Sequence, residues 1–347
     1  MVRDFRRFLI VRTDRIGDVI LTLPMARVLR DHYPQAHIAM LIRPYTAELV
    51  EDDPVVDQIL LHDDEKQPAS FMSLVSSLRA DRFDVVFHTH PRFRLALLTW
   101  WAGIPVRVGT GYRWYSFLFN KKVFEHRRDA KRHELEYNLN LLQAVGCDPG
   151  ELHVAPSLAV HPRRLGEVKA MLAEAGIGAD DRIVILHPGS GGSAREWSPD
   201  HFGALGNRLS GIPGVKIVVV GLKSEEARIE RVRSAAGTSA AALVNRLTIG
   251  QYAALSKLSS LLISNSTGPI HIASAVGTPV IGLYSQIVPL SAARWGPYTD
   301  KKTIFTPKDK SPDCRTCLGS RDGSCECMDS ISVDEVYRGA LPYLGVQ

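Results

Sequence analysis

The chain has 347 residues, of which 45% are hydrophobic and 23% are charged, and this composition predicts a soluble globular protein of two domains. Its net charge of +5 is too small for a dedicated nucleic-acid binder. Every apolar run is shorter than the roughly 18 residues that cross a bilayer, and the run at 8–11 is too short for a signal peptide. We therefore expect a cytoplasmic protein without a membrane anchor.

Short apolar runs alternate with helical patterns through the first half of the chain. The expected strands are 8–11, 37–42, 55–61, 84–87 and 106–108. The expected helices are 18–33, 71–80, 94–102 and 133–145. The segment 147–162 contains three prolines and few periodic apolar positions, which predicts a linker.

The same alternation begins again after this linker. The expected helices are 163–175, 198–209, 224–236, 249–258, 269–276 and 333–344, and the expected strands are 183–186, 215–220, 261–263 and 280–283. This order predicts an α/β protein with a parallel sheet in each half, and ligands bind such sheets beyond the carboxyl ends of the strands. We expect domains at 1–155 and 156–330, with the C-terminal helix of 331–347 packing back on the first domain.

The loop after the first strand, Arg12–Asp18, carries aspartates where a dinucleotide-binding loop would carry glycines. Its one glycine, Gly17, makes it a poor pyrophosphate site and argues against a nicotinamide dehydrogenase. A carboxylate at a helix start stays ionised near pH 7 and can take a proton from a hydroxyl. Asp18 is therefore our candidate general base. The alternative is that Asp18 or Asp14 only caps the helix.

Two loops of the second half contain residues that favour the binding of an anion. The loop 187–197 is rich in glycine and serine and contains Ser190 and Arg195, so its amides, hydroxyls and guanidinium could bind a diphosphate. The alternative is a glycine loop without a ligand. The loop 264–271 places Thr267 and His271 at the start of a helix. A lone histidine there can equally be structural, but two such loops in one domain predict a nucleoside diphosphate site.

Basic residues gather in two places of the first half. Arg92 and Arg94 lie beside His88 and His90, and a second group follows at 127–133. A solvated face explains both groups, and attraction to an anionic substrate or an acidic membrane surface is the functional alternative. Trp100 and Trp101 could touch a membrane, although a buried helix face is the favoured interpretation.

Five cysteines are present, and Cys147 stands apart as an expected buried, inert thiol. The other four form a CxxC and a CxC pair: Cys314, Cys317, Cys325 and Cys327. This spacing fits a structural zinc site, conditional disulfides or four free thiols.

The motifs together resemble glycosyltransferase family 9, the ADP-heptose:lipopolysaccharide heptosyltransferases. The segments that carry the resemblance are 13–24 (TDRIGDVILTLP), 187–190 (HPGS), 195–197 (REW), 265–271 (NSTGPIH) and 314–336. The resemblance implies a GT-B fold, in which two Rossmann-like domains face each other across a cleft. It also implies an N-terminal acceptor domain and a C-terminal nucleotide-sugar domain.

This resemblance further implies an inverting transfer that needs no metal or other cofactor. The donor would be ADP-heptose or a related sugar nucleotide, and the acceptor an anionic lipopolysaccharide core at the cytoplasmic face of the inner membrane, with no nucleic acid involved. Asp18 is the implied base. The implied donor contacts are Ser190, Arg195, Glu225, Ser266, Thr267, Gly268 and His271. Our candidate acceptor contacts are Thr13, Gly17, His90, Arg92 and Arg94.

Two positions depart from the family pattern. Arg195 stands where members usually have lysine, and Ser266 stands where many have aspartate. A sugar-nucleotide 2-epimerase on the same fold and a non-catalytic nucleotide- or lipopolysaccharide-binding protein are the alternatives.

Overall fold

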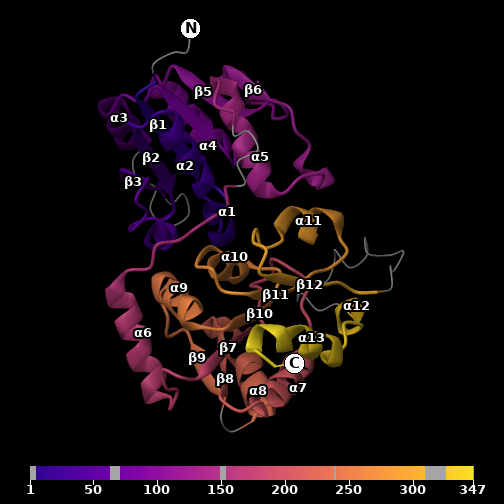
Figure 1. The fold of residues 1–347 in the computed structure, drawn as a ribbon. Helices are drawn as coiled ribbons and strands as arrows, with labels where there is room; N and C mark the ends of the chain where they lie inside the picture. Colours follow the sequence, from indigo (N-terminus) through magenta and orange to yellow (C-terminus); the bar gives the residue numbers. More distant parts are fainter. Residues whose placement is uncertain (1–4, 63–70, 149–153, 238–239, 309–325, 347) are drawn as a thin grey trace. The chain divides into compact units, whose positions relative to one another are not determined.

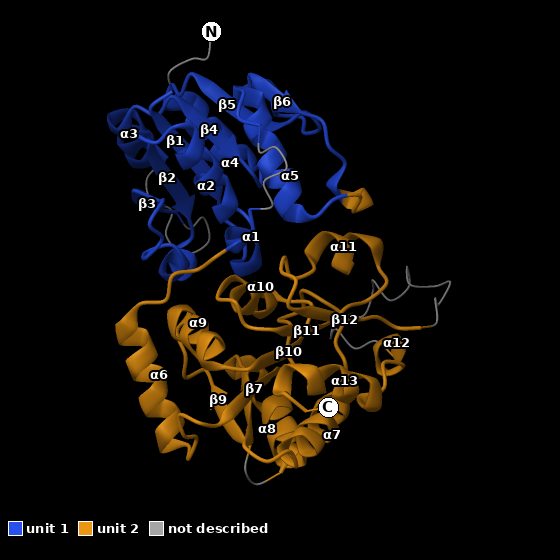
Figure 2. Ribbon diagram, in the orientation of Figure 1, with its two compact units in different colours: residues 1–127, 132–156 blue, residues 128–131, 157–347 orange. Residues whose placement is uncertain are grey.

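The computed structural model describes residues 5–62, 71–148, 154–237, 240–308 and 326–346. It divides into two compact units (Figure 2), with residues 1–127 and 132–156 in unit 1 and residues 128–131 and 157–347 in unit 2. The expected α/β class is confirmed, because each unit contains a six-stranded parallel sheet within the described residues. The change of unit falls between Pro156 and Ser157, inside the expected linker.

The sheet of unit 1 has the strand order β3-β2-β1-β4-β5-β6 (Figure 1). Its strands are β1 Arg7–Arg12, β2 His37–Ile42, β3 Gln58–Leu61, β4 Val85–His88, β5 Val106–Thr110 and β6 Lys121–Val123. Its α-helices are α1 Ile16–Ile20, α2 Leu23–His32, α3 Phe71–Asp81, α4 Phe93–Trp101 and α5 Glu134–Asn140. Short 3₁₀ helices are η1 Pro44–Leu49, η2 Ser116–Leu118, η3 Arg127–Asp129 and η4 Leu141–Val145.

The sheet of unit 2 repeats this topology with the order β9-β8-β7-β10-β11-β12. Its strands are β7 Arg182–His187, β8 Val215–Gly221, β9 Ala241–Val244, β10 Leu261–Asn265, β11 Val280–Leu283 and β12 Lys302–Phe305. Its helices are α6 Pro162–Glu174, α7 Pro199–Ser210, α8 Glu226–Ala236, α9 Ile249–Leu258, α10 Gly268–Ala275, α11 Ala292–Trp295, α12 Glu326–Asp329 and α13 Val333–Ala340. The 3₁₀ helices are η5 Lys223–Glu225, η6 Val288–Leu290 and η8 Leu341–Leu344.

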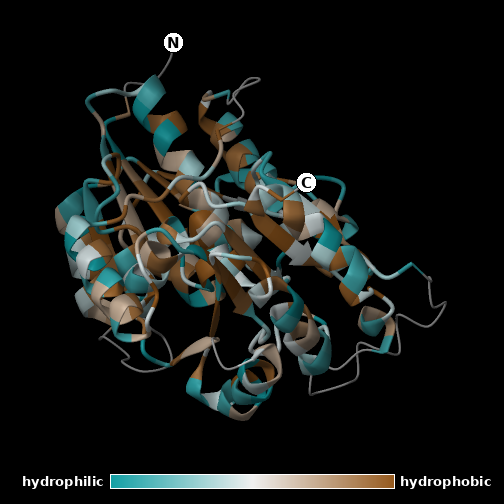
Figure 3. Ribbon diagram, turned by 60° about the horizontal axis from the view of Figure 1, so that its bottom comes forward, coloured by the Kyte–Doolittle hydropathy of each residue, from teal (hydrophilic) through white to brown (hydrophobic). Residues whose placement is uncertain are grey.

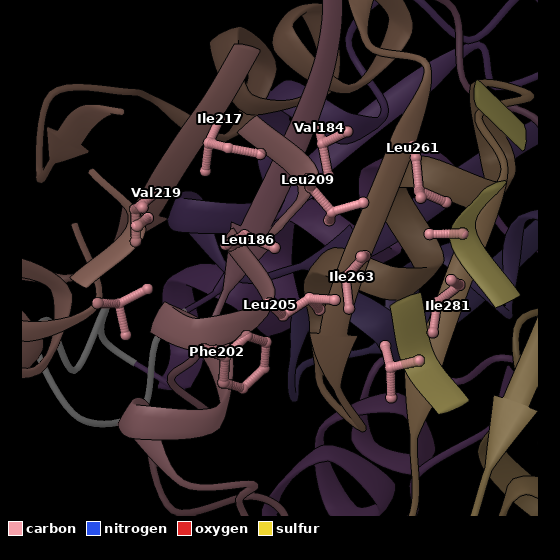
Figure 4. Packing of buried hydrophobic residues seen from close by; sticks show 14 of the residues in the cluster. Val184, Leu186, Phe202, Leu205, Leu209, Ile217, Val219, Leu261, Ile263 and Ile281 are labelled. Carbon is pink, nitrogen blue, oxygen red and sulfur yellow. The ribbon is translucent and has the colours of Figure 1, made fainter. Parts of the chain in front are cut away.

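Apolar residues are concentrated in the strands of each unit (Figure 3). In Figure 3 the strands are mostly brown, while the helices alternate between brown and teal faces. The unit 2 core (Figure 4) joins side chains of four strands with one face of α7, among them Val184, Leu186, Ile217, Val219, Leu261, Ile263, Ile281, Phe202, Leu205 and Leu209. Full burial of one such side chain stabilises the fold by about 1.5–3 kcal/mol.

Three strands escaped the sequence analysis: β6, β9 and β12. All three are short edge strands with partners on one side, so their residues lack the long apolar runs of the central strands. The expected helix 18–33 is two helices, α1 and α2. The break at Leu21–Thr22 precedes Pro24, which has no N–H and begins a new helical turn.

The C-terminal segment differs from expectation, because it packs within unit 2 rather than returning to unit 1. Val336, Ala340 and Leu344 join the unit 2 core. The buried indole of Trp197 donates a hydrogen bond to the carbonyl of Ile331, with a nitrogen–oxygen distance of 2.9 Å. The apolar face of α13 is thus covered by its own unit.

Two smaller expectations can also be checked. Cys147 is buried, and burial raises the pKa of its thiol, which fits an inert cysteine. Cys314, Cys317 and Cys325 lie outside the described residues, as does any site they form with Cys327. Across the described segments, no helix has the length and apolar character of a membrane span.

Candidate functional site

The two loop regions singled out in the sequence occupy equivalent places in the two sheets. In each unit the strand order reverses between two central strands, β1 and β4 in unit 1 and β7 and β10 in unit 2. Crevices for ligands form at such reversals, beyond the carboxyl ends of the strands. Asp18 and His90 follow β1 and β4, while Ser190 and Thr267 follow β7 and β10.

Unit 1 holds a buried ionic group that we call the Arg12 cluster: Arg12, Asp14, Asp18, Arg127 and Glu134. The Arg12 guanidinium pairs through Nη2 with Oδ1 of Asp18, through Nε with Oδ1 of Asp14 at 2.7 Å, and through Nη1 with Oε1 of Glu134 at 3.5 Å. Arg127 pairs with the same Glu134 oxygen at 2.5 Å. Three carboxylates therefore share two guanidinium groups.

The two aspartates of this cluster differ in their remaining contacts. Oδ2 of Asp14 lies 2.9 Å from Nδ1 of His90, so both oxygens of Asp14 have partners. Asp18 is held through Oδ1 alone, and no hydrogen bond to its Oδ2 occurs among the described residues. In the described part of the chain, a substrate hydroxyl would find an unoccupied carboxylate oxygen on Asp18, whereas both oxygens of Asp14 already have a cationic or imidazole partner.

Their pKa values differ in the same sense. Burial would raise the pKa of Asp14, but Arg12 and His90 outweigh burial and hold it at about 2. Burial raises the pKa of Asp18, and the negative charges of Asp14 and Glu134 add to this, so its pKa lies above the ordinary value despite Arg12. A raised pKa makes Asp18 the stronger base of the two.

The capping alternative for these aspartates does not hold within the described contacts. Helix α1 begins after Arg15, and no side chain caps its N-terminus. Asp18 lies in the first turn, where the helix dipole favours its ionised form. Asn138 of α5 fixes the junction that follows α1, since its amide donates to Leu21 O and Thr22 Oγ1 at 3.1 and 3.2 Å.

The proposed basic group around His90 is only partly a surface feature. His88 is buried, and its Nε2 forms a hydrogen bond with Thr99 Oγ1 at 2.9 Å. Burial lowers the pKa of His88 to about 3, so the imidazole is neutral at pH 7. His90 contacts the Arg12 cluster through Asp14. Arg92 is the exposed N-cap residue of α4, and Arg94 is half-buried one residue into that helix. Of the remaining acceptor candidates, Thr13 is half-buried and Gly17 is buried in α1.

In unit 2, residues 187–197 form what we call the glycine loop. Gly191 and Gly192 have φ angles of +55° and +74°, a conformation that residues with a Cβ seldom adopt. The amide of Gly191 donates to Oε1 of Glu225 at 3.2 Å. A Cβ at Gly189 would lie 2.0 Å from that same oxygen, so the carboxylate lies directly against the loop. Glu225, rather than its exposed neighbour Glu226, is therefore the residue at the loop.

The second loop of unit 2 meets the glycine loop directly. Ser193 Oγ donates to Thr267 Oγ1 at 3.4 Å, and Asn265 Nδ2 donates to Pro188 O at 2.8 Å. Thr267 precedes α10 as its N-cap residue, and its side chain caps no amide of the helix. The hydroxyl of Thr267 thus contacts the glycine loop at the start of α10, where the first amides of the helix begin with Gly268.

The remaining donor candidates are distributed around these loops. Ser190 is buried and donates to Glu196 Oε1 at 2.7 Å, and Glu196 in turn pairs with Arg228. Arg195 and His271 are both buried, on the glycine loop and in α10. Ser266 is half-buried between β10 and Thr267.

Sequence reasoning missed part of each site. It overlooked Arg12 and Glu134, which are 122 positions apart in the chain, and it overlooked Asn265, which ties the two loops of unit 2. It also overlooked His187, whose pKa burial lowers to about 4 and whose Nδ1 lies 3.4 Å from the Tyr252 hydroxyl. The motif at 12–18 contained Arg12, and an arginine directly after an apolar strand and next to two aspartates was the one available signal.

Comparisons with known proteins agree with this architecture. A family model for glycosyltransferase family 9 (heptosyltransferase) matches residues 71–319. Lipopolysaccharide heptosyltransferase 3 of Escherichia coli is 24% identical over 302 residues, which is 84% of this chain and 86% of that protein.

Solved structures show the same fold. The glycosyl transferase family 9 structure from Veillonella parvula DSM 2008 is 22% identical, covers 99% of this chain and 98% of its own, and has a TM-score of 0.86. The structure of E. coli heptosyltransferase WaaC with ADP is 16% identical, covers 97% and 99%, and has a TM-score of 0.73.

Two parallel-sheet units of identical strand order, together with these likenesses, define a glycosyltransferase of GT-B fold. Since the family model spans more than half of the sequence, the chain belongs to glycosyltransferase family 9, the heptosyltransferase family.

Proposed function

We propose that this chain transfers a heptose from ADP-heptose to an inner-core sugar of lipopolysaccharide, with inversion at the anomeric carbon and without a metal ion. The family supports glycosyl transfer. The name of the E. coli relative supports lipopolysaccharide and heptose, and the ADP complex of the E. coli neighbour supports the nucleotide.

The observation that carries the proposal is the state of Asp18. Arg12 holds Oδ1 of Asp18, Oδ2 is left for a substrate, and burial together with the neighbouring carboxylates raises the pKa of Asp18. Such a group is a positioned general base, and a base of this kind contributes about 10²–10⁴-fold to a rate.

The proposed step moves one proton and one glycosyl group. Asp18 takes the proton of the acceptor hydroxyl, and that oxygen forms a bond to the anomeric carbon. The bond between this carbon and the β-phosphate oxygen breaks on the opposite face, and its electron pair leaves with ADP. Thr13, Gly17, His90, Arg92 and Arg94 are the proposed acceptor contacts around the base.

The leaving diphosphate gains negative charge in this step. Arg195, Ser190, Thr267, the Gly268 amide and His271 are proposed to stabilise that charge, so that a divalent cation is not required. Glu225 is proposed to accept a hydrogen bond from the ribose, because its carboxylate lies against the glycine loop. Ser266 is proposed to contact the sugar.

A two-part experiment tests the proposal. The purified chain is first screened by thermal shift against ADP-, UDP- and GDP-linked sugars, where ligand occupancy raises the melting temperature. It is then given the winning donor, with EDTA present, and lipopolysaccharide cores truncated at successive sugars. We expect ADP-heptose to stabilise the chain most and one truncated core to gain a heptose of inverted linkage. Stabilisation only by UDP- or GDP-sugars, or epimerisation of the donor without an acceptor, would contradict the proposal.

A further inference from the structure

Unit 1 carries an exposed group of aromatic side chains in a stretch of unusual charge. Residues 85–124 contain six Arg and Lys and no Asp or Glu, although the whole chain contains 37 acidic residues. Large exposed hydrophobic residues concentrate in the same stretch. Five of them define what we call the aromatic surface: Phe93, Tyr112, Trp114, Phe117 and Phe124.

Three side chains of the aromatic surface are mostly exposed to solvent. Trp114 is 73% exposed, Phe117 68% and Phe124 62%. The Phe93 and Trp114 rings lie 4.8 Å apart, and the Tyr112 and Phe124 rings 5.4 Å apart. The first pair is tilted and the second is T-shaped, so rings that remain largely exposed contact one another and form apolar surface open to a partner.

Buried contacts hold the loop that carries these rings. The Tyr115 hydroxyl donates to Pro91 O at 2.7 Å, which ties the loop to the start of α4. Ser116 Oγ donates to Thr110 O at 2.7 Å and closes the turn after β5. A Cβ at Gly111 would lie 2.2 Å from the Phe124 ring, so only glycine lets that ring lie across the end of β5. The aromatic side chains are therefore displayed on a fixed scaffold.

Positive charge surrounds the aromatic surface. Arg92, Arg113, Lys121 and Lys122 are exposed, and none of them pairs with a carboxylate of the described residues. Arg92 and Arg113 lie close enough to Tyr115 to lower the pKa of its phenol against the larger effect of burial, which raises it. Tyr115 contacts both Phe93 and Trp114, so charge and rings share one place.

This combination selects one kind of partner. Trp and Tyr favour the interface between water and hydrocarbon, and basic residues are attracted to anionic lipid headgroups. A protein partner would be met equally well by a face of mixed charge. We propose that the aromatic surface and its four basic residues dock unit 1 on an anionic lipid bilayer.

The place of this surface fits the proposed function, on which this part of the inference rests. Tyr112 and Phe124 follow the carboxyl ends of β5 and β6, and β5 is the second strand from β1. Neighbouring strands are about 4.8 Å apart, so the end of β5 lies about 10 Å from the end of β1, near Asp18. A sugar acceptor anchored in lipid beside Tyr112 and Trp114 would reach the base over a few sugar units.

The structure also corrects the expectation for α4. Trp100 and Trp101 were assigned to a buried helix face, but they are 50% and 44% exposed. They end α4, whereas Phe93 begins it beside Trp114. The proposed lipid contact therefore involves the start of α4 and the loop after β5, rather than the Trp100–Trp101 pair.

The test is vesicle sedimentation of the full chain with phosphatidylethanolamine vesicles that contain phosphatidylglycerol, compared with vesicles of phosphatidylcholine alone. Three variants are compared with the wild type. Trp114→Ser with Phe117→Ser removes rings, and Arg113→Gln with Lys121→Gln and Lys122→Gln removes charge. Leu61→Ser with Met72→Ser is the matched control, because these residues are similarly exposed in unit 1 but lie outside residues 85–124. Melting temperatures establish that all variants fold.

We expect the wild type and the control to bind the anionic vesicles in a salt-dependent manner. Each basic residue removed should weaken binding about five-fold, and each ring removed about ten-fold. Equal binding to phosphatidylcholine, no binding of the wild type, or an equal loss in the control would overturn the proposal. A wild-type dimer that Trp114→Ser with Phe117→Ser makes monomeric, without vesicle binding, would assign the surface to a second copy instead.

A second assay separates this inference from the proposed function. Transfer to a deacylated, water-soluble core acceptor should be unchanged in the ring and charge variants, while transfer to the same core on vesicles should fall. If the wild type transfers to neither acceptor but binds anionic vesicles, the proposed function fails and the lipid surface stands.

Discussion

The loops at the two strand-order reversals present different chemical groups to a ligand. In unit 1 the Arg12 cluster gathers five ionisable side chains around β1, and burial together with their charges shifts the pKa values of two aspartates in opposite directions. In unit 2 the glycine loop and the start of α10 offer backbone amides and hydroxyls, with Arg195 as a buried cation. Side-chain charge suits a proton transfer, whereas oriented amides suit binding of a diphosphate. The comparison therefore predicts that substitutions in the Arg12 cluster lower the rate alone, whereas substitutions in the unit 2 loops also weaken binding of the donor.

The largest effect is expected from Asp18→Asn. The amide cannot accept the proton, so kcat should fall by about 10²–10⁴-fold. Because unit 2 is unchanged, the dissociation constant for ADP should stay at the wild-type value. Steady-state kinetics and calorimetry measure the two quantities. Asp31→Asn, an exposed carboxylate on α2, is the control and should keep full activity. Wild-type kcat in Asp18→Asn would remove Asp18 from the role of base.

A smaller loss of rate, with a loss of affinity, is expected from Arg195→Gln. Losing one charge-stabilising donor lowers kcat by about 10²–10³-fold, and the lost cation should also weaken ADP binding. Arg208→Gln, which removes an exposed arginine of the same unit, should leave both unchanged. Arg195 is buried, so urea unfolding should accompany the kinetics. Unchanged ADP affinity in a folded Arg195→Gln chain would place the diphosphate elsewhere.

Stability should separate Asp14 from Asp18. The folded-state pKa of Asp14 lies near 2 against an ordinary value of 3.8, so its ionised form stabilises the fold by about 2 kcal/mol at neutral pH. This contribution is present above pH 4 and is lost as the pH falls towards 2. Asp14→Asn should therefore lower the free energy of unfolding by about 2 kcal/mol at pH 7, while Asp18→Asn, whose pKa is raised, should not. Urea unfolding at several pH values measures this, and equal losses in both variants would refute the distinction.

The smallest effect concerns the backbone of the glycine loop. Gly191 has a φ of +55° and open space around its Cβ position, so the Ala side chain of Gly191→Ala clashes with nothing. Only the left-handed backbone conformation disfavours this variant, by about 1 kcal/mol. ADP affinity should fall about five-fold if the loop holds its present conformation to bind. Gly166→Ala is the matched control, because Gly166 also has open space but lies in helix α6 without a positive φ. An unchanged affinity would separate the loop conformation from binding.

The sequence was sufficient for the parts of the molecule that repeat a local pattern. The central strands, such as β2 and β11, matched their apolar runs residue for residue, because strands buried on both faces need continuous apolar residues. The loops with Asp18, Ser190 and Thr267 could be placed beyond strand ends because glycine, proline and hydroxyl residues interrupt the apolar pattern there.

Other features depended on residues far apart in the chain. Nothing local indicated that Glu134 reaches Arg12, that His88 is buried and neutral, or that Asp14 and Asp18 have opposite pKa shifts. The packing of α13 was also mispredicted, because an amphipathic helix shows which face is buried and not which unit covers it. The aromatic surface appeared only when exposure could be measured side chain by side chain.

The central claim is that Asp18 must be ionised for transfer, and the pH dependence of the single-turnover rate tests it most directly. With donor bound and acceptor saturating, the wild-type rate should fall about ten-fold per pH unit on the acid side of a pKa above 3.8, the ordinary value for aspartate. The residual rate of Asp18→Asn should lack this acid limb. The same acid limb in Asp18→Asn would show that another group titrates and would contradict the account.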